Sequence, residues 1–164
     1  VEVAHEHDVP LIVENDTRVL GRSGADGLIV TNGVQSLKDA IARFSPKKII
    51  GYGNVKTRHD AMTAGELLPD FLFVGKLGGD IRAEPHPKSL AIAGWCVEVM
   101  ELPVVVMGGT AIGSAVAAAE TGAEFVALGR AVFDAEDSPS VAVAAVNELL
   151  DERAPDIFHD DERT

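Results

Sequence analysis

The sequence is short of cysteine and of positive charge, and it has no long apolar run. Cys96 is the only cysteine in 164 residues, so no disulfide can form within the chain, and a reducing, cytoplasmic setting fits best. The 14 lysines and arginines are outnumbered by 26 aspartates and glutamates, and the resulting net charge of −12 argues against nucleic acid or an anionic membrane surface as the main partner. No apolar stretch approaches the ~20 residues that cross a membrane.

Several motifs of catalysis and cofactor binding are absent as well. The chain has no Cys-x-x-Cys pair, no Gly-x-Ser-x-Gly turn and no recognisable Ser–His–Asp set. No Gly-x-Gly-x-x-Gly follows an apolar run, and the segment GYGN at Gly51–Asn54 has only two of those glycines. These absences argue against thiol redox chemistry, serine hydrolysis and dinucleotide binding.

Short apolar runs of strand-forming residues recur along the chain. There are six, at Leu11–Val13, Leu28–Val30, Ile49–Tyr52, Phe71–Val74, Val104–Met107 and Phe125–Leu128. Because they are nearly all apolar rather than alternating, they are typical of strands covered on both faces, as in a parallel sheet. Helical segments lie between them, so the pattern predicts βαβ units and an α/β fold. A weak repeat supports this, since an acidic residue precedes the strand in GADGLIV, LPDFLFV and GAEFVAL.

Two closures of such a sheet fit the pattern. An open, doubly wound sheet would use the whole chain, whereas an eight-stranded (β/α) barrel of about 250 residues needs two more units. At roughly 30 residues a unit, these would be about 60 residues before Val1. The chain starts at Val1 without Met, which suggests that the gene begins earlier. We expect residues 1–154 to form a single domain and residues 155–164 a frayed tail.

The fifth and sixth apolar runs both end in glycine. In parallel α/β folds ligands bind at the carboxyl ends of the strands, and the last two turns of a barrel commonly bind phosphate. Glycine lets an anion approach backbone N–H groups, and a following helix capped by Thr110 would add its dipole. The pattern therefore predicts a phosphate site at Gly108, Gly109, Gly129 and Arg130.

The order and spacing of five segments resemble the thiamine phosphate synthase and TenI superfamily. The segments are LIVENDTRVLGRSGADGLIV, IIGYGN, PDFLFVGKL, PVVVMGGT and TGAEFVALGRAVF, and they cover about residues 10–133. Members are (β/α)8 TIM barrels, so the resemblance implies a barrel of which this chain supplies about six βα units and lacks the first two strands. The synthases join a hydroxymethylpyrimidine diphosphate to a thiazole phosphate, with Mg²⁺ on the diphosphate and release of pyrophosphate. TenI members tautomerise a thiazole phosphate carboxylate.

The resemblance also implies site residues on the first two strands. The family's Asn–Asp pair falls on Glu14 and Asn15, or, with a slip of one residue, on Asn15 and Asp16. Asp16 is thus a candidate Mg²⁺ ligand, or alternatively the N-cap of the next helix. After the second strand, Asn32 replaces a family glutamine and Gly33 falls near a metal-binding aspartate. Asn32 either binds substrate or forms a turn with Gly33. Because Gly33 stands near the position of the aspartate, few carboxylate ligands remain for Mg²⁺.

The remaining candidates follow the third and fourth strands. Asn54 ends the GYGN segment at the expected ligand edge. In the loop GKLGGDIRAEPHPK, Lys76 and Arg82 are the candidate cations for phosphate or carboxylate. His86, between two prolines, either moves a proton near neutral pH or belongs to the restrained start of a helix.

Three functions follow from these residues. The first is a thiamine phosphate synthase-type transferase, with Glu14, Asp16, Lys76 and His86 as catalytic groups. The second is a metal-independent TenI-like isomerase in which Glu14, Asp16 or His86 moves a proton. The third is a non-catalytic paralogue that binds a phosphorylated small molecule. A homodimer of the barrel is possible, and the sequence does not decide it.

Overall fold

The structure is a computed structural model that describes residues 1–157. Residues 155–157 are exposed and outside any helix or strand, and the rest of the expected tail lies beyond the described residues. Within the described part, no helix has the length and apolar character needed to span a membrane.

Six parallel strands form one sheet, and their order in the sheet is their order in the chain. The strands are β1 (Ile12–Glu14), β2 (Gly27–Val30), β3 (Ile49–Val55), β4 (Phe71–Val74), β5 (Val104–Met107) and β6 (Phe125–Ala127). The six predicted apolar runs therefore all form strands. Their near-continuous apolar character follows from burial on both faces, as expected for a parallel sheet.

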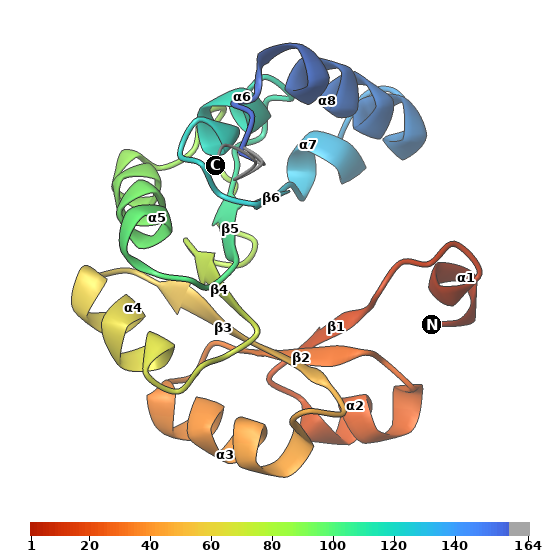
Figure 1. Cartoon of the computed structure of the whole chain (residues 1–164). Coiled ribbons are helices and arrows are strands. Elements are labelled where there is room, and N and C mark those ends of the chain that lie inside the picture. The colour runs from red at the N-terminus through yellow and green to blue at the C-terminus, as the bar shows by residue number, and fades with distance from the viewer. Residues whose placement is uncertain (158–164) are drawn as a thin grey trace, which may run out of the picture.

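Helices alternate with the strands. They are α1 (Glu2–His5), α2 (Thr17–Ser23), α3 (Val34–Phe44), α4 (Arg58–Gly65), α5 (Pro87–Val99), α6 (Ser114–Ala119), α7 (Arg130–Phe133) and α8 (Pro139–Arg153). The sheet curls into a half-barrel, with α2 to α5 on its outer side (Figure 1). The predicted α/β architecture is confirmed, with six parallel strands in one curled sheet.

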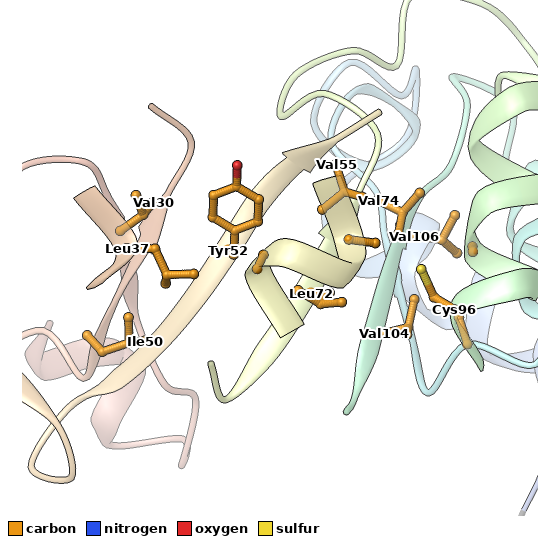
Figure 2. Packing of buried hydrophobic residues seen from close by; sticks show 14 of the residues in the cluster. Val30, Leu37, Ile50, Tyr52, Val55, Leu72, Val74, Cys96, Val104 and Val106 are labelled. Carbon is orange, nitrogen blue, oxygen red and sulfur yellow. The ribbon is translucent and has the colours of Figure 1, made fainter. Parts of the chain in front are cut away.

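The core lies mainly between the sheet and its outer helices. Alternate strand residues point to opposite faces, and one set packs against the helices in a large buried cluster (Figure 2) that includes Leu28, Leu37, Ile50, Leu72, Cys96 and Val104. A smaller cluster, built on Ile29, Phe73 and Met107, covers the concave face. Burial raises the pKa of the Cys96 thiol to about 11, so this cysteine is a packing residue.

The acidic residues of the weak repeat tie neighbouring strands together. Each carboxylate accepts a hydrogen bond from a backbone N–H at the amino end of the preceding strand. The three bonds join Leu11 to Asp26 at 2.7 Å, Ile50 to Asp70 at 2.6 Å and Val104 to Glu124 at 2.8 Å. The Leu11 N–H, followed by a hydrogen bond with His5, lowers the pKa of Asp26. The repeat thus has a structural role at the edge opposite the expected ligand site.

Candidate functional site

Glu14 and Asn15 meet at the carboxyl ends of β1 and β2 through a residue that the sequence did not single out, Thr31. The Thr31 hydroxyl donates to Glu14 Oε1 at 2.9 Å and accepts from Asn15 Nδ2 at 2.7 Å. The Thr31 N–H donates to Asn15 Oδ1 at 2.8 Å, and Asn15 has a left-handed backbone with φ of 54°. Asn15 and Asn32 line one shallow hollow beside these groups. Thr31 therefore links the Glu14 carboxylate to Asn15 at this edge.

Asp16 caps the helix α2. Its Oδ1 accepts hydrogen bonds from the N–H groups of Arg18 and Val19, both at 2.9 Å. These two bonds, that of Val19 first, lower the pKa of Asp16. The capping alternative of the sequence analysis is confirmed, and the cap ties the carboxylate to the helix backbone.

The donor atoms at this edge do not fit a Mg²⁺ site built by the protein. Within residues 1–157, no three His, Cys, Asp or Glu side chains gather where they could hold a metal ion. The turn after β2 carries Asn32 and Gly33 instead of a carboxylate, and Gly33 precedes α3 as its N-cap with φ of 113°. Glu14 and Asp16 each have one oxygen engaged by the protein. A bound Mg²⁺ would depend on oxygens of the ligand for most of its coordination.

A cavity of about 280 Å³ opens at the carboxyl ends of β3, β4 and β5, where α5 begins. We call it the lysine pocket, because its lining includes Lys56, Lys76, His86, Lys88, Ser89 and Met107. Three lysines thus line one cavity in a protein whose net charge is −12. The amino end of α5 adds the positive end of its dipole, so the pocket favours an anion.

His86 is the N-cap of α5, and its Nδ1 accepts a hydrogen bond from the Lys88 N–H at 3.2 Å. In the neutral ring the proton is therefore on Nε2, which can donate to an oxygen of a ligand. The predicted place of His86 at the start of a helix and its predicted proton-moving role are compatible with each other.

Two lysines of the pocket were missed from the sequence. Lys56 follows β3 directly, and Lys88 ends the loop GKLGGDIRAEPHPK, so both carried a usable signal. Asn54, just before, has φ of 64° at an irregularity in the pairing of β3 with β4. Its Oδ1 is buried and has no hydrogen-bond partner among the described residues. Such a group has a desolvation cost that a ligand donor would relieve.

The turn after β5 packs against the loop that joins β4 to α5. The Thr110 N–H donates to the Arg82 carbonyl at 2.8 Å, and the Ala111 N–H donates to the Ala83 carbonyl at 3.2 Å. A Cβ on Gly109 would lie 2.1 Å from the Ala83 oxygen, so only glycine fits at this close approach. The loop therefore fills the space beside Gly109 that was predicted for phosphate, and it accepts the N–H groups of Thr110 and Ala111.

The expected N-cap at Thr110 is wrong, because α6 begins at Ser114 and no side chain caps it. Thr110 lies in a turn before the helix, where packing against the β4–α5 loop outweighs the local capping preference. The Gly109 N–H donates to Ser114 Oγ at 2.9 Å, and the Gly108 N–H donates to the Ala127 carbonyl at 2.9 Å. Gly108 also lines the lysine pocket.

The turn after β6 holds a buried carboxylate. The Arg130 N–H donates to Asp80 Oδ2 at 2.5 Å, and Asp80 is 2% exposed. The Arg130 side chain is exposed and lines a separate cavity that includes Thr110 and Asp134. The predicted site residues thus form three groups along one edge of the sheet: those at β1 and β2, those in the lysine pocket, and those around the last two turns.

The fold and the site define a parallel α/β half-barrel with a cationic pocket at the carboxyl ends of its strands. A family model described as thiamine monophosphate synthase matches residues 1–132. The chain belongs to this family.

Curated relatives agree with this assignment, and solved structures match the fold. The thiamine-phosphate synthase of Hyphomonas neptunium is 30% identical over 153 residues, which are 93% of this chain and 69% of the relative. The same enzyme of Rhodospirillum centenum is 31% identical, over 87% of this chain and 70% of the relative. The fold matches thiamine phosphate pyrophosphorylase from Pyrococcus furiosus with a TM-score of 0.77 at 24% identity, covering 96% and 73% of the two chains. It also matches a 3-hexulose-6-phosphate synthase with a TM-score of 0.67 at 21% identity, covering 93% and 78%.

Proposed function

We propose that the chain is a transferase of thiamine biosynthesis that joins a pyrimidine diphosphate to a thiazole phosphate. The observation that carries the proposal is the convergence of Lys56, Lys76 and Lys88 with His86 in one cavity of an acidic protein. The family and its curated relatives support the reaction class. The lysine pocket is proposed to bind the diphosphate.

The chemistry needs stabilisation of the leaving group. The bond between the pyrimidine methylene carbon and the diphosphate oxygen breaks, the electron pair leaves with pyrophosphate, and the carbon accepts an electron pair from the thiazole. Because negative charge grows on the departing oxygen, the three ammonium groups stabilise the transition state more than the ground state. The Nε2–H of His86 donates to an oxygen of the departing group.

The groups on β1 and β2 are proposed to orient the heterocycle. Glu14 is held by Thr31 and offers its second oxygen to an N–H group of the ligand. The amides of Asn15, Asn32 and Asn54 are proposed to complete the polar contacts. Asp16 acts on this arrangement through the start of α2 rather than by touching substrate.

The thiazole phosphate is proposed to bind at the last two turns, with Arg82, Gly108, Gly109, Gly129 and Arg130 around it. Their backbone N–H groups and cationic side chains are suited to a phosphate. Occupation of this place requires the β4–α5 loop to move, since that loop now contacts both turns.

A metal-independent isomerase of the TenI kind is the second candidate. The observation that favours it is the absence of a carboxylate in the turn after β2, where Asn32 and Gly33 stand. In that reaction Glu14 or His86 would move a proton of a phosphorylated thiazole without any leaving group. The third candidate is a protein that binds a phosphorylated ligand without turnover.

Lysine variants test the lysine pocket. We expect Lys76→Ala and Lys88→Ala each to weaken binding of the pyrimidine diphosphate, measured by calorimetry, by about tenfold or more, since a charge-assisted hydrogen bond contributes about 1.5–3 kcal/mol. Lys47→Ala is the matched control, because Lys47 is an exposed lysine before β3, at the opposite edge of the sheet. Equal binding by the pocket variants and the control would contradict the proposed site.

Product formation then separates the three functions. Release of pyrophosphate that stops with excess chelator supports the transferase with Mg²⁺ on the diphosphate. Turnover of a thiazole phosphate carboxylate that is indifferent to chelator supports the isomerase. Tight binding without product from either substrate supports the binding protein.

The remaining features of the architecture are proposed from the same family membership. The six βα units are proposed to belong to an eight-unit barrel, with residues 1–154 in that one domain. The curl of the sheet and the likeness to thiamine phosphate pyrophosphorylase support this (Figure 1). A homodimer and a cytoplasmic location stay predictions from the sequence.

A further inference from the structure

The loop between β4 and α5, residues 75–86, covers the carboxyl ends of β5 and β6, and we call it the covering loop. Its backbone carbonyls at Arg82 and Ala83 accept hydrogen bonds from the turn after β5. Its side chain at Asp80 reaches the turn after β6. The covering loop thus supplies oxygen acceptors to both glycine-containing turns, the one after β5 and the one after β6.

Asp80 is buried without a cationic partner. Its side chain is 2% exposed, and in the described part of the chain no lysine or arginine nitrogen forms an ion pair with it. Within residues 1–157, the hydrogen-bond donor to Asp80 is the Arg130 N–H, at 2.5 Å. Burial of a carboxylate is costly unless hydrogen bonds compensate for lost water. The turn after β6 thus holds the Asp80 carboxylate through the Arg130 N–H.

The space beside Gly129 is shaped around this carboxylate. A Cβ on Gly129 would meet Asp80 Oδ2 at 2.9 Å, and the next two nearest atoms are also those of the Asp80 carboxyl group. Gly129 therefore leaves room for a negatively charged group with oxygen acceptors. In this structure the chain provides that group itself.

We propose that Asp80 is an internal anion that competes with the phosphate of the ligand for the turn after β6. A phosphate oxygen would accept the same Arg130 N–H that the Asp80 carboxylate accepts. Two negative groups that share one N–H lie close together and repel each other. Phosphate can enter only when Asp80 leaves, so binding releases the covering loop. The loop also carries Lys76 and His86, so occupation of the turn changes the lysine pocket.

This inference rests on the proposed function only in taking the ligand to be phosphorylated. Asp80 becomes a specificity-determining residue, because it lowers the affinity for thiazole phosphate without affecting an unphosphorylated thiazole. A purely structural Asp80 would hold the loop in place, and its loss would weaken both ligands or neither.

The test compares thiazole phosphate with the corresponding thiazole alcohol by calorimetry. We expect Asp80→Ala to bind thiazole phosphate about tenfold more tightly than the wild type does, with no change for the alcohol. Asp80→Asn keeps an acceptor for the Arg130 N–H and removes the charge, so we expect an intermediate gain. No gain for the phosphate in Asp80→Ala, including no binding to either protein, would overturn the proposal.

Hydrogen exchange on the wild-type chain gives a measurement that does not depend on how the variants fold. Saturation with thiazole phosphate, or with inorganic phosphate as the simpler probe, should speed exchange in residues 76–83. Slower or unchanged exchange there would overturn the proposal. The lysine variants test only the binding of the diphosphate, whereas the Asp80 variants test the binding of thiazole phosphate. A gain of affinity for thiazole phosphate in Asp80→Ala therefore supports this inference whether or not the lysine variants weaken diphosphate binding.

Discussion

Tyr52 illustrates how one polar group behaves inside the core. It is 5% exposed on β3, and its hydroxyl donates to Asp60 Oδ1 on α4 at 3.0 Å. Burial, then the hydrogen bond with Asp60, raises the pKa of Tyr52 to about 12. Ionisation of the phenol is therefore less favourable in the folded chain than in the unfolded one.

The sign of the pH dependence follows from that shift. The stabilising contribution of protonated Tyr52 is complete below the pKa of about 10 in the unfolded chain and is lost as pH rises toward about 12. We expect Tyr52→Phe to lose about 1 kcal/mol at neutral pH through the lost hydrogen bond. Its free energy of unfolding, measured in urea, should also fall less steeply than that of the wild type as pH rises above about 9.5. Parallel decline of the two proteins would contradict this account.

At the scale of single residues, sequence reasoning found some chemical groups and missed their partners. Lys76 and His86 were identified from their place after a strand and between prolines. Thr31, which orients Glu14, carried no signal because its contacts come from a neighbouring strand. Asp80 likewise carried no signal, because its partner Arg130 is 50 residues away in the chain.

At the scale of elements, the acidic residues before β2, β4 and β6 link the strands at their amino ends. The repeat is visible in the sequence, but the hydrogen bonds that explain it are seen only when the strands are paired in the sheet. Each acid accepts a backbone N–H at the amino end of the strand before it. The register of the sheet is thereby reinforced where the chain enters it.

Asp70 is the most direct test of this link. We expect Asp70→Ala to lower the free energy of unfolding by about 1–3 kcal/mol, because the N–H of the fully buried Ile50 loses its side-chain acceptor. Asp70→Asn, which keeps an acceptor oxygen, should stay near the wild type. Glu66→Ala is the control, since Glu66 is an exposed acid just after α4. Urea unfolding of all three variants would show the difference, and a loss in the control as large as in Asp70→Ala would refute it.

The boundaries of elements were predicted unevenly. Phe71–Val74 and Val104–Met107 match β4 and β5, because an apolar run bounded by turn residues is a local property. The start of α6 was misplaced, since Thr110 is a good capping residue whose N–H is instead used by the covering loop. Tertiary contact thus overrode local preference at a turn beside the site.

At the scale of the whole molecule, the half-barrel has two strands with one neighbour each. Within the described residues β1 pairs only with β2, and β6 pairs only with β5. Phe125 on β6 is 58% exposed, which is unusual for a large apolar residue in a parallel strand. An apolar strand edge of this kind favours pairing with another chain.

We therefore expect the chain of residues 1–164 to associate as its concentration rises. Phe125→Lys should weaken that association by about 1–2 kcal/mol through lost apolar burial and added charge repulsion, as measured by sedimentation. Val99→Lys is the matched control, because Val99 is 51% exposed on α5, away from the sheet edges. A monodisperse wild type, or an equal effect of both substitutions, would count against an open edge at β6.

The amino-acid sequence was sufficient for the order of strands and helices, the buried character of the sheet and the family. These follow from apolar runs, glycine breaks and spacing, which are properties of segments a few residues long. The contacts of the site needed the folded chain, because they join residues distant in sequence. Lys56, Lys76 and Lys88 converge only when three strands end side by side, and Asp80 meets Arg130 across 50 residues of chain. A glycine in a turn predicts room for an anion, but only the packed loops determine whether ligand or protein supplies it.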